Sequence, residues 1–404
     1  MPSSRNIAVI GNGIAGITIA YQLARRGAKV TIYDKERYPA MGTSYANGAQ
    51  LSVCNSQVWN TWPMVRKGIS WMFRKDAPFY IHPSFSYDKM RWLMQFLNVT
   101  RKNQFVENTK KTIGLALASR ATYNEIIDEE MISFNQVRAG ILHVYTDENS
   151  LAQALSHTDL MESSGCDWKN LSPDECREVD PALRNNQLMV GGIMSGNDTT
   201  GDCHQFVNNL SKILVEKYNV KMILGHEVKH ISPNFYEVAV DEEPYDDVVI
   251  ATGVDSQRWG KKFGDHLNIY PVKGYSITVT LPNNDDYGVA PWVSLLDDDA
   301  KIVCSRVAIN QIRIAGTAEL AGNNLDIKRE RILPLLNWVN KWFPTIDTRK
   351  YSPWAGLRPM TPNMLPHYRQ GNHNRVWYHC GHGHLGFTMA PGTAKILSKL
   401  MLDK

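Results

Sequence analysis

The sequence predicts an α/β protein with a Rossmann-like dinucleotide-binding domain and a second α+β domain built on an antiparallel sheet. Three observations support this fold class. An apolar run at residues 7–10 leads into the glycine motif Gly11-Asn-Gly13-Ile-Ala-Gly16, and a second apolar run precedes Asp34. A later apolar run ends in Ala251-Thr252-Gly253. Runs of β-forming residues predict antiparallel strands of another sheet at 275–281, 301–303 and 311–315.

The glycine motif predicts a strand, a tight turn and a helix, in that order. Gly11 permits the turn, Gly13 lets the backbone approach a pyrophosphate, and Gly16 lets the helix at residues 14–26 pack against the strand. The N-terminus of this helix presents free backbone N–H groups and the positive end of its dipole to the phosphates. The first residues of the helix, which we expect at the cofactor, are Ile14 and Ala15.

Asp34 completes the dinucleotide-binding pattern. Gly27 stops the helix, and residues 29–33 supply a second parallel strand. Asp34, at the end of that strand and next to Lys35, is placed to accept hydrogen bonds from a ribose diol. In Ala251-Thr252-Gly253, small residues let the chain pass under a bound dinucleotide.

Composition and charge exclude several classes of protein. A chain of 404 residues predicts two domains, and 43% hydrophobic with 21% charged residues indicates a globular protein. A formal charge of +4 without clustering does not indicate a nucleic-acid partner. The sequence shows neither a membrane span nor a signal peptide. Six scattered cysteines without a Cys-x-x-Cys pair indicate reduced thiols, so we expect a cytoplasmic protein.

The other segments divide between the two domains. We expect the nucleotide domain at residues 1–57, 187–269 and 352–404, and the second domain at 58–186 and 270–351. Helices are predicted at residues 87–100, 107–131, 150–163, 201–218 and 387–402. A strand is predicted at 140–145, a third parallel strand of the nucleotide domain at 221–224, and a hairpin at 227–231 with 236–240.

Five further motifs, together with the first, resemble a known family. They are Gly42-Thr-Ser44-Tyr-Ala-Asn47-Gly48, Gly201-Asp-Cys-His204, Pro271-Val-Lys273-Gly-Tyr275-Ser, Trp354-Ala-Gly-Leu-Arg358-Pro-Met-Thr-Pro362 and Gly381-His-Gly-His-Leu-Gly386. Along nearly its whole length the chain resembles the D-amino acid oxidase superfamily of flavoproteins, and most closely the bacterial D-amino acid dehydrogenases. This resemblance implies a FAD-binding domain of the glutathione-reductase type and a substrate-binding domain.

The resemblance also implies where FAD binds. The first glycine motif and Asp34 hold the pyrophosphate and the ribose, and Val228 offers backbone contacts to the adenine. Residues expected beside the isoalloxazine, which needs hydrogen-bond partners, are Ser44, Asn47, Gly48 and Gln50. For Ser44 and Asn47, ordinary turn chemistry is the alternative. The N-terminus of the final helix stabilises negative charge on the flavin, through Gly383, His384, Leu385 and Gly386.

Arg358 is the main candidate for substrate binding. A guanidinium holds a carboxylate by two parallel hydrogen bonds and so fixes the α-carbon; the alternative is a surface salt bridge. Tyr275 is a candidate hydroxyl near the same carboxylate, although a strand tyrosine is commonly just half-buried. Lys273 is a candidate cation at the pocket or the flavin edge, with a solvated strand end as the alternative. His382 is a further candidate for the pocket.

Three histidines near the C-terminus raise the question of a metal site. His379, His382 and His384 are close in sequence, but the glycines between them make a mobile scaffold and no acidic or thiolate ligands accompany them. We therefore expect no metal.

The expected reaction is oxidative deamination of a D-amino acid. Hydride transfer from the neutral amine to flavin N5 gives an imino acid, which water hydrolyses to a 2-oxo acid and ammonia. Orientation and electrostatic stabilisation lower the barrier without a side-chain base. The resemblance implies a quinone or respiratory-chain acceptor. Residues 59–98, including 71–75, are rich in aromatic and basic residues. Two roles for this segment stay open: part of the core, as for most such apolar stripes, or a peripheral contact with the cytoplasmic face of the inner membrane.

Three other functions remain open at this point. An enzyme that oxidises a secondary amine or glycine, such as sarcosine, glycine or hydroxyproline, shares every motif. An NAD-dependent dehydrogenase is disfavoured by the interrupted nucleotide domain, and a flavin-binding module without activity is the third option. Departures from the family pattern are Asn12 in the first motif, the order Asn47-Gly48-Ala49, and the loop at residues 361–366.

Overall fold

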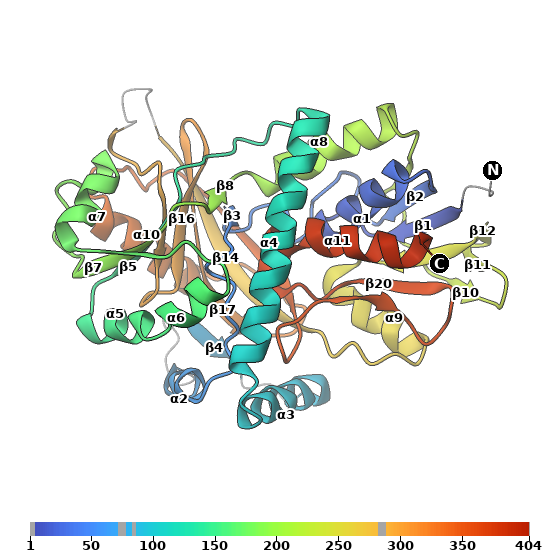
Figure 1. The fold of residues 1–404 in the computed structure, drawn as a ribbon, viewed down its shortest axis with the longest axis horizontal. Helices are drawn as coiled ribbons and strands as arrows, with labels where there is room; N and C mark the ends of the chain where they lie inside the picture. The colour runs from blue at the N-terminus through green and yellow to red at the C-terminus, as the bar shows by residue number, and fades with distance from the viewer. Residues whose placement is uncertain (1–4, 72–77, 83–85, 282–287, 404) are drawn as a thin grey trace.

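The computed structural model describes residues 5–71, 78–82, 86–281 and 288–403. Its strands form a six-stranded sheet, a nine-stranded sheet and two smaller sheets. The six-stranded sheet lies on the right of Figure 1 and the nine-stranded sheet on the left, with the long helix α4 (Phe105–Glu130) crossing in front of the region between them. The predicted α/β fold with two sheets is thus confirmed.

The six-stranded sheet contains the predicted dinucleotide-binding unit. Its order is β19 (His367–Gln370), β20 (Val376–Cys380), β13 (Asp247–Ile250), β1 (Asn6–Ile10), β2 (Lys29–Asp34) and β9 (Lys221–Leu224). All neighbours pair in parallel except β19 with β20. The predicted third parallel strand at 221–224 is therefore confirmed, and β20 and β19, which lie on the side of β13 away from β1, come from the C-terminal part of the chain.

Alternate residues of β1 point to two separate cores, as expected for a parallel sheet covered on both faces. Ile7 and Val9 pack with α1 (Ile14–Arg25), α4, α8 (Cys203–Glu216) and α11 (Gly386–Leu402). Ala8 and Ile10 pack against α9 (Ser256–Lys262) and the small sheet of β10 (Ile231–Pro233), β11 (Val238–Val240) and β12 (Glu243–Tyr245). Both faces of β1 are thereby covered, and the turn that follows it starts from a buried strand.

The nine-stranded sheet is mostly antiparallel. Its order is β18 (Tyr351–Met360), β14 (Tyr270–Thr280), β17 (Gln311–Leu320), β16 (Ile302–Ala308), β15 (Ser294–Asp297), β5 (Ile141–Tyr145), β7 (Gly191–Ser195) and β6 (Lys169–Leu171), with β4 (Phe79–Ile81) beside β17. The predicted strands at 275–281, 301–303 and 311–315 lie in β14, β16 and β17. Two pairs, β15 with β5 and β17 with β4, are parallel.

The remaining elements connect the two large sheets or cover them. They are α2 (Trp62–Trp71), α3 (Tyr87–Arg101), α5 (Glu148–Leu155), α6 (Thr158–Ser163), α7 (Pro173–Val179), α10 (Arg329–Trp342) and the two-stranded sheet of β3 (Gln50–Leu51) and β8 (Thr199–Thr200). Single 3-10 turns lie at Pro181–Leu183, Gly253–Asp255 and Gly383–Leu385. In the described residues, no helix is both long and apolar enough for a membrane span.

Two local predictions are wrong in part. The helix expected at 150–163 is divided into α5 and α6, because the His157 N–H bonds to the Ala154 carbonyl three residues back and tightens the chain there. The hairpin expected from 227 begins at Ile231, because the backbone N–H groups of Lys229 and His230 donate to the Asp241 carboxylate.

The pairing of two strands bears on the domain division. The expected boundaries place residues 187–269 and 352–404 with the six-stranded sheet, whereas β7 and β18, which lie within these ranges, pair inside the nine-stranded sheet. The division of the chain into two domains stays a prediction. Pairing of β18 with β14 brings Arg358 opposite Val272.

Candidate active site

A cavity of about 1320 Å3 extends from the turn after β1 to the facing strands β14 and β18. This volume exceeds that of pockets for drug-sized ligands, about 300–1,000 Å3, and suits a dinucleotide together with a substrate. The predicted site residues that line it are Gly11, Gly13, Ile14, Ala15, Asp34, Lys35, Ser44, Asn47, Gly48, Gln50, Val228, Ala251, Thr252, Gly253, Tyr275, Arg358, His382, Gly383, His384, Leu385 and Gly386. Gly16 and Lys273 do not line it.

The first glycine motif has the backbone geometry that a dinucleotide-binding turn requires. Gly11 has φ +108°, and a Cβ there would lie 2.5 Å from the carbonyl oxygen of Ala251. A Cβ on Gly16 would lie 1.7 Å from the carbonyl oxygen of Gly11. Gly16 therefore acts beneath the turn, by letting α1 pack against it, and not through contact with the cavity.

Asp34 is held at the end of β2 by backbone groups. Its Oδ2 accepts from the Asn12 N–H at 2.5 Å, and its Oδ1 accepts from the Glu36 N–H at 2.8 Å. The carboxylate thus has a fixed orientation at the cavity wall. Lys35, next in the chain, lies 3.3 Å from Asp255 in an ion pair.

Asn12, which the sequence marked just as a departure from the family pattern, is the strongest sign that this end of the cavity fits a polar ligand. Its side chain is fully buried and lines the cavity, and neither Nδ2 nor Oδ1 has a hydrogen-bond partner among the described residues. A buried polar group without a partner costs about 1–3 kcal/mol. The amide, the two constrained glycines and Asp34 together fit the polar ribose and pyrophosphate groups of FAD.

Residues of the loop before β3 form hydrogen bonds within the protein and also line the cavity. The Ile14 N–H donates to the Ser44 hydroxyl at 3.1 Å, and Asn47 Oδ1 accepts from the Ala49 N–H at 3.0 Å. Gln50 Nε2 donates to Ser294 Oγ at 2.9 Å. Turn chemistry, the alternative for Ser44 and Asn47, accounts for the contact of Asn47 with Ala49, whereas Ser44 accepts from a residue 30 positions away in the chain. Both residues line the cavity.

Arg358 projects from β18 into the cavity. A Cβ on Gly274 would lie 2.3 Å from Arg358 Nη2, so the guanidinium needs a glycine at that position of β14. Nη1 donates to the Thr317 carbonyl at 3.0 Å, and no described residue forms an ion pair with Arg358. Burial lowers its pKa to about 10. Arg358 therefore forms no surface salt bridge with a described residue, and a half-buried cation at a cavity wall without a carboxylate partner indicates an anionic ligand.

Tyr275 and Lys273 belong to a buried cluster centred on Glu319. The Tyr275 hydroxyl donates to Glu319 Oε2 at 2.7 Å, and Lys273 Nζ lies 3.5 Å from the same oxygen. Lys328 Nζ lies 3.0 Å from Oε1. Burial opposes ionisation of Glu319, but hydrogen bonds from Tyr275 and Lys328 and the charge of Lys273 lower its pKa overall.

Because Lys273 and Tyr275 bind Glu319, their expected contacts with the substrate or the flavin have to be revised. Lys273 is neither a cation at the cavity nor a solvated strand end, because it is buried and donates to Asn324 Oδ1 and the Asp326 carbonyl. Successive strand residues point to opposite faces, so Lys273 points away from the side on which Val272 and Gly274 line the cavity. Tyr275 contributes to the cavity wall, but its hydroxyl is committed to Glu319.

His379 and His382 are buried, His384 is half-buried, and lowered pKa values leave all three uncharged near neutral pH. Thr393 Oγ1 lies 2.8 Å from Nε2 of His379 and 2.9 Å from Nε2 of His382. Burial lowers the pKa of His379 to about 4 and that of His382 well below its usual value. His384 stacks on Trp59 with ring centroids 4.4 Å apart, and burial, then the charge of Arg358, lower its pKa to about 3.

Within the described residues, no group of three or more His, Cys, Asp or Glu side chains is arranged for a metal ion. The ring nitrogen Nε2 of His384 has no hydrogen-bond partner there. These uncharged rings add no positive charge beside Arg358.

Several cavity residues were not identified from the sequence. Trp354 lies on the same face of β18 as Arg358, and a Cβ on Gly356 between them would lie 2.0 Å from the Trp354 ring. The alternation of Trp354, Gly356 and Arg358 is the signal that could have assigned Trp354 to the wall. Thr317, on β17, also lines the cavity, and no sequence pattern marked it. Trp59 lines the cavity too, although the sequence placed it in the aromatic and basic segment 59–98 and not at the site.

Comparison with known proteins shows the family of the chain. The family described as FAD dependent oxidoreductase matches residues 6–400. The chain is 42% identical to D-amino acid dehydrogenase 3 of Mesorhizobium japonicum over 402 residues, which cover 98% of this chain and 96% of that protein. It is 32% identical to a D-amino acid dehydrogenase of Dechloromonas aromatica, again over 98% and 96% of the two chains.

Solved structures share the fold at lower identity. Glycine oxidase from Bacillus cereus superposes with a TM-score of 0.74 and 19% identity, covering 98% of this chain and 95% of that one. L-proline dehydrogenase from P. horikoshii superposes with a TM-score of 0.72 and 18% identity, covering 100% and 94%. At this identity the similarity shows the fold alone.

Proposed function

The chain belongs to the FAD dependent oxidoreductase family, and we propose that it catalyses the oxidative deamination of D-amino acids to 2-oxo acids and ammonia. The observation that carries this proposal is Arg358, whose half-buried guanidinium has no carboxylate partner among the described residues and lines the same cavity as a dinucleotide-binding turn. The relatives that are 42% and 32% identical are D-amino acid dehydrogenases, which favours this substrate class over secondary amines. Family membership excludes the alternative of an NAD-dependent dehydrogenase.

The residues of the chain bind and orient the substrate. Bound FAD supplies the two-electron acceptor. Arg358 holds the substrate carboxylate, and the Thr317 carbonyl and Gly274 fix the position of the guanidinium. The aromatic walls formed by Trp59 and Trp354 shield the α-carbon from water, which strengthens the carboxylate–guanidinium interaction. No side-chain base is assigned, because the substrate is taken up as the neutral amine.

Anaerobic reduction of the bound flavin tests the function. The purified protein should be yellow, and its flavin absorption should bleach with a small neutral D-amino acid. The L-enantiomer should leave it oxidised, because the fixed guanidinium and the walls hold one enantiomer with its α-hydrogen toward the cofactor. Sarcosine, glycine and hydroxyproline complete the panel. Bleaching by these amines and not by any D-amino acid would instead support the alternative substrate class.

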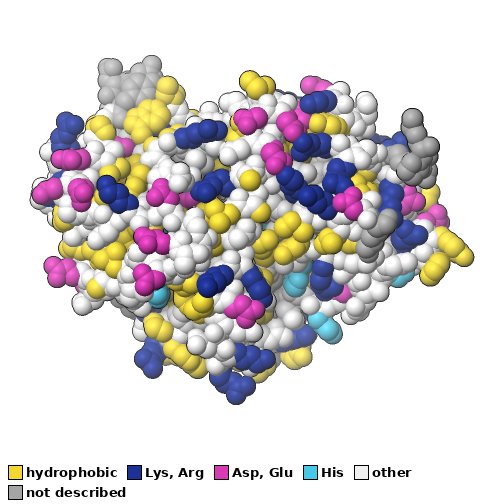
Figure 2. Space-filling view, viewed as in Figure 1, with side chains coloured by type: hydrophobic (Ala, Val, Ile, Leu, Met, Phe, Trp, Pro, Cys, Tyr) yellow, Lys and Arg dark blue, Asp and Glu magenta, His cyan; other side chains and the backbone are white. Residues whose placement is uncertain are grey.

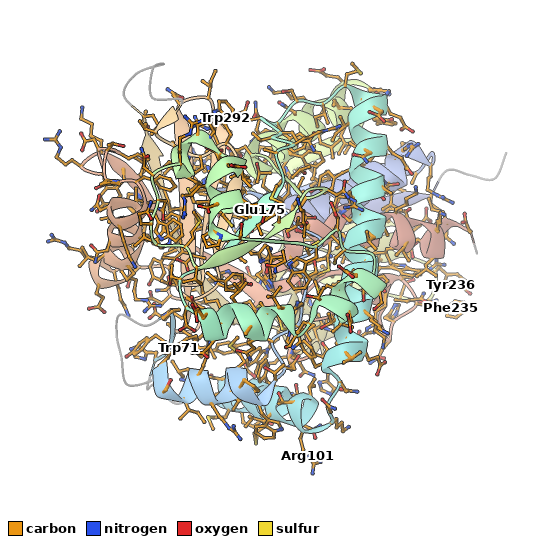
Figure 3. All side chains as sticks on the ribbon, turned by 60° about the vertical axis from the view of Figure 1, so that its left-hand side comes forward. Trp71, Arg101, Glu175, Phe235, Tyr236 and Trp292 are labelled. Atoms are coloured by element: carbon orange, nitrogen blue, oxygen red, sulfur yellow. The ribbon has the colours of Figure 1, made fainter. Side chains whose placement is uncertain are left out.

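We propose further that a membrane quinone accepts the electrons, and that α2 and α3 contact the membrane. α2 has no buried residue, and Trp62, Ile69 and Met94 are 49%, 55% and 60% exposed. Figure 2 shows hydrophobic and basic side chains together at the lower end of the molecule, where Figure 1 places these helices. Figure 3 shows Trp71 and Arg101 at this end. Such helices suit an anionic bilayer surface.

The segment at 59–98 divides between this surface and the protein interior. Trp92 is 7% exposed and packs with Val58, Tyr270 and Met360, which agrees with the core alternative for this part. Ile69 and Met94, in contrast, are exposed and line the mouth of the cavity. Residues 72–77 and 83–85 of this segment lie outside the described residues. A quinone could thus reach the cavity from the side that carries the exposed apolar residues.

Vesicle sedimentation tests the membrane contact. Wild-type protein should sediment with vesicles that contain phosphatidylglycerol and much less with phosphatidylcholine vesicles. Trp62→Glu should weaken binding about tenfold, because burial of one large apolar side chain contributes about 1.5–3 kcal/mol. Tyr236→Glu is the matched control, since Tyr236 is 79% exposed at the hairpin between β10 and β11. Equal binding by both variants would contradict the proposal. Peroxide formation in air, compared with reduction of a quinone analogue, tests the acceptor.

A further inference from the structure

Thr317 has an unusual backbone conformation at the point where β17 passes Arg358. Its φ is +55°, in the left-handed region that a β-branched residue rarely adopts. The pairing of β14 with β17 shifts here, because Lys273 pairs with Glu319 whereas Tyr275 pairs with Gly316. β17 therefore carries one extra residue in a β-bulge, a device that redirects backbone and side-chain groups beside functional sites.

The bulge turns the Thr317 carbonyl toward the substrate-binding guanidinium. Arg358 Nη1 donates to this oxygen at 3.0 Å, while the guanidinium lies over Gly274. These two contacts leave the other N–H groups of Arg358 free of any partner in the described part of the chain. The backbone role of Thr317 would be met equally well by glycine, which adopts positive φ without strain.

The side-chain hydroxyl of Thr317 forms no hydrogen bond in the described part of the chain. The residue is 4% exposed and lines the cavity, and Oγ1 has no hydrogen-bond partner among the described residues. The other hydroxyl expected near the substrate carboxylate, that of Tyr275, is committed to Glu319. Thr317 thus brings an unused hydroxyl to the residue that already contacts Arg358.

We propose that Thr317 is a second carboxylate-binding residue, whose hydroxyl donates a hydrogen bond to the substrate carboxylate while its carbonyl positions Arg358. The proposal rests on the proposed function, which supplies the carboxylate. A carboxylate accepts several hydrogen bonds through its two oxygens, so Arg358 and a hydroxyl can bind it together. This explains why a strained position carries threonine and not glycine.

Three variants of Thr317 separate the hydroxyl from the backbone. Thr317→Val keeps the shape and removes the hydroxyl, Thr317→Ser keeps the hydroxyl, and Thr317→Gly removes both the hydroxyl and the strain. The probe is propionate, a carboxylate without an amine, and its dissociation constant is measured on the FAD-loaded protein from the change in flavin absorption. Thr317→Val and Thr317→Gly should raise this constant about tenfold, and Thr317→Ser should stay within about twofold of wild type.

Thermal unfolding and flavin reduction complete the test. Thr317→Gly should raise Tm although it weakens carboxylate binding, because it relieves the left-handed strain. KM for a D-amino acid should follow the propionate constant, with FAD content unchanged. Wild-type affinity for propionate in Thr317→Val, or an equal loss in Thr317→Val and Thr317→Ser, would overturn the proposal. The wild-type protein could bind propionate normally while no D-amino acid reduces its flavin. That result would refute the proposed function, and the propionate constants of the variants would still decide whether Thr317 binds a carboxylate.

Discussion

Replacement of Arg358 by alanine is expected to raise KM for a D-amino acid by at least about 100-fold, while FAD stays bound. The guanidinium lines the cavity and has no ion pair with a described residue, so it is available to the substrate carboxylate. Hydrogen bonds between charged groups contribute about 1.5–3 kcal/mol each, and the guanidinium can form two in parallel. KM is measured from anaerobic flavin reduction at a series of substrate concentrations, and FAD content from the visible absorption.

Two further variants make this result specific. Arg358→Lys keeps the positive charge but loses the fork of two N–H groups, so its KM should fall between those of wild type and Arg358→Ala. Arg25→Ala is the same substitution at the surface, where Arg25 pairs with Glu129, and it should leave KM unchanged. An Arg358→Ala protein with the wild-type KM would remove Arg358 from the carboxylate-binding role.

The dinucleotide-binding unit could be predicted from the sequence because its constraints are local. Steric conflict within a few residues requires Gly11 and Gly16, and short apolar runs define β1, β2, β9 and β13. Asp34 could be identified because it is the last residue of β2, directly after an apolar run. Each of these signals depends on neighbours in the chain, and a single sequence contains that information.

The substrate end of the cavity could be predicted less completely, because it depends on pairing between distant strands. The direction of Lys273 follows from the register of β14 against β17, and the bulge at Thr317 leaves no pattern in the sequence. The hydroxyl of Tyr275 is directed to Glu319, a residue 44 positions away, which no motif indicated. Arg358 was identified because it lies in a family motif, whereas its contacts with Gly274 and Thr317 required the structure.

Replacement of Gly16 by alanine is expected to abolish FAD binding at micromolar cofactor. The new Cβ would lie 1.7 Å from the carbonyl oxygen of Gly11, a backbone atom that cannot rotate away. α1 must then move off β1, and with it Gly13 and the backbone N–H groups that face the pyrophosphate. Overpacking of this kind costs about 1–3 kcal/mol in stability, so Tm should also fall.

The control for Gly16→Ala is Gly114→Ala in α4, where a Cβ would meet no atom within 4 Å. Because alanine favours a helix interior over glycine by about 0.5–1 kcal/mol, this variant should keep its FAD and unfold at the same or a higher temperature. FAD affinity is measured by titrating the apoprotein with FAD and following flavin fluorescence. Equal FAD affinity in Gly16→Ala and Gly114→Ala would contradict a pyrophosphate site at the turn after β1. The cofactor would then have to lie in the opposite direction along the cavity, or outside it.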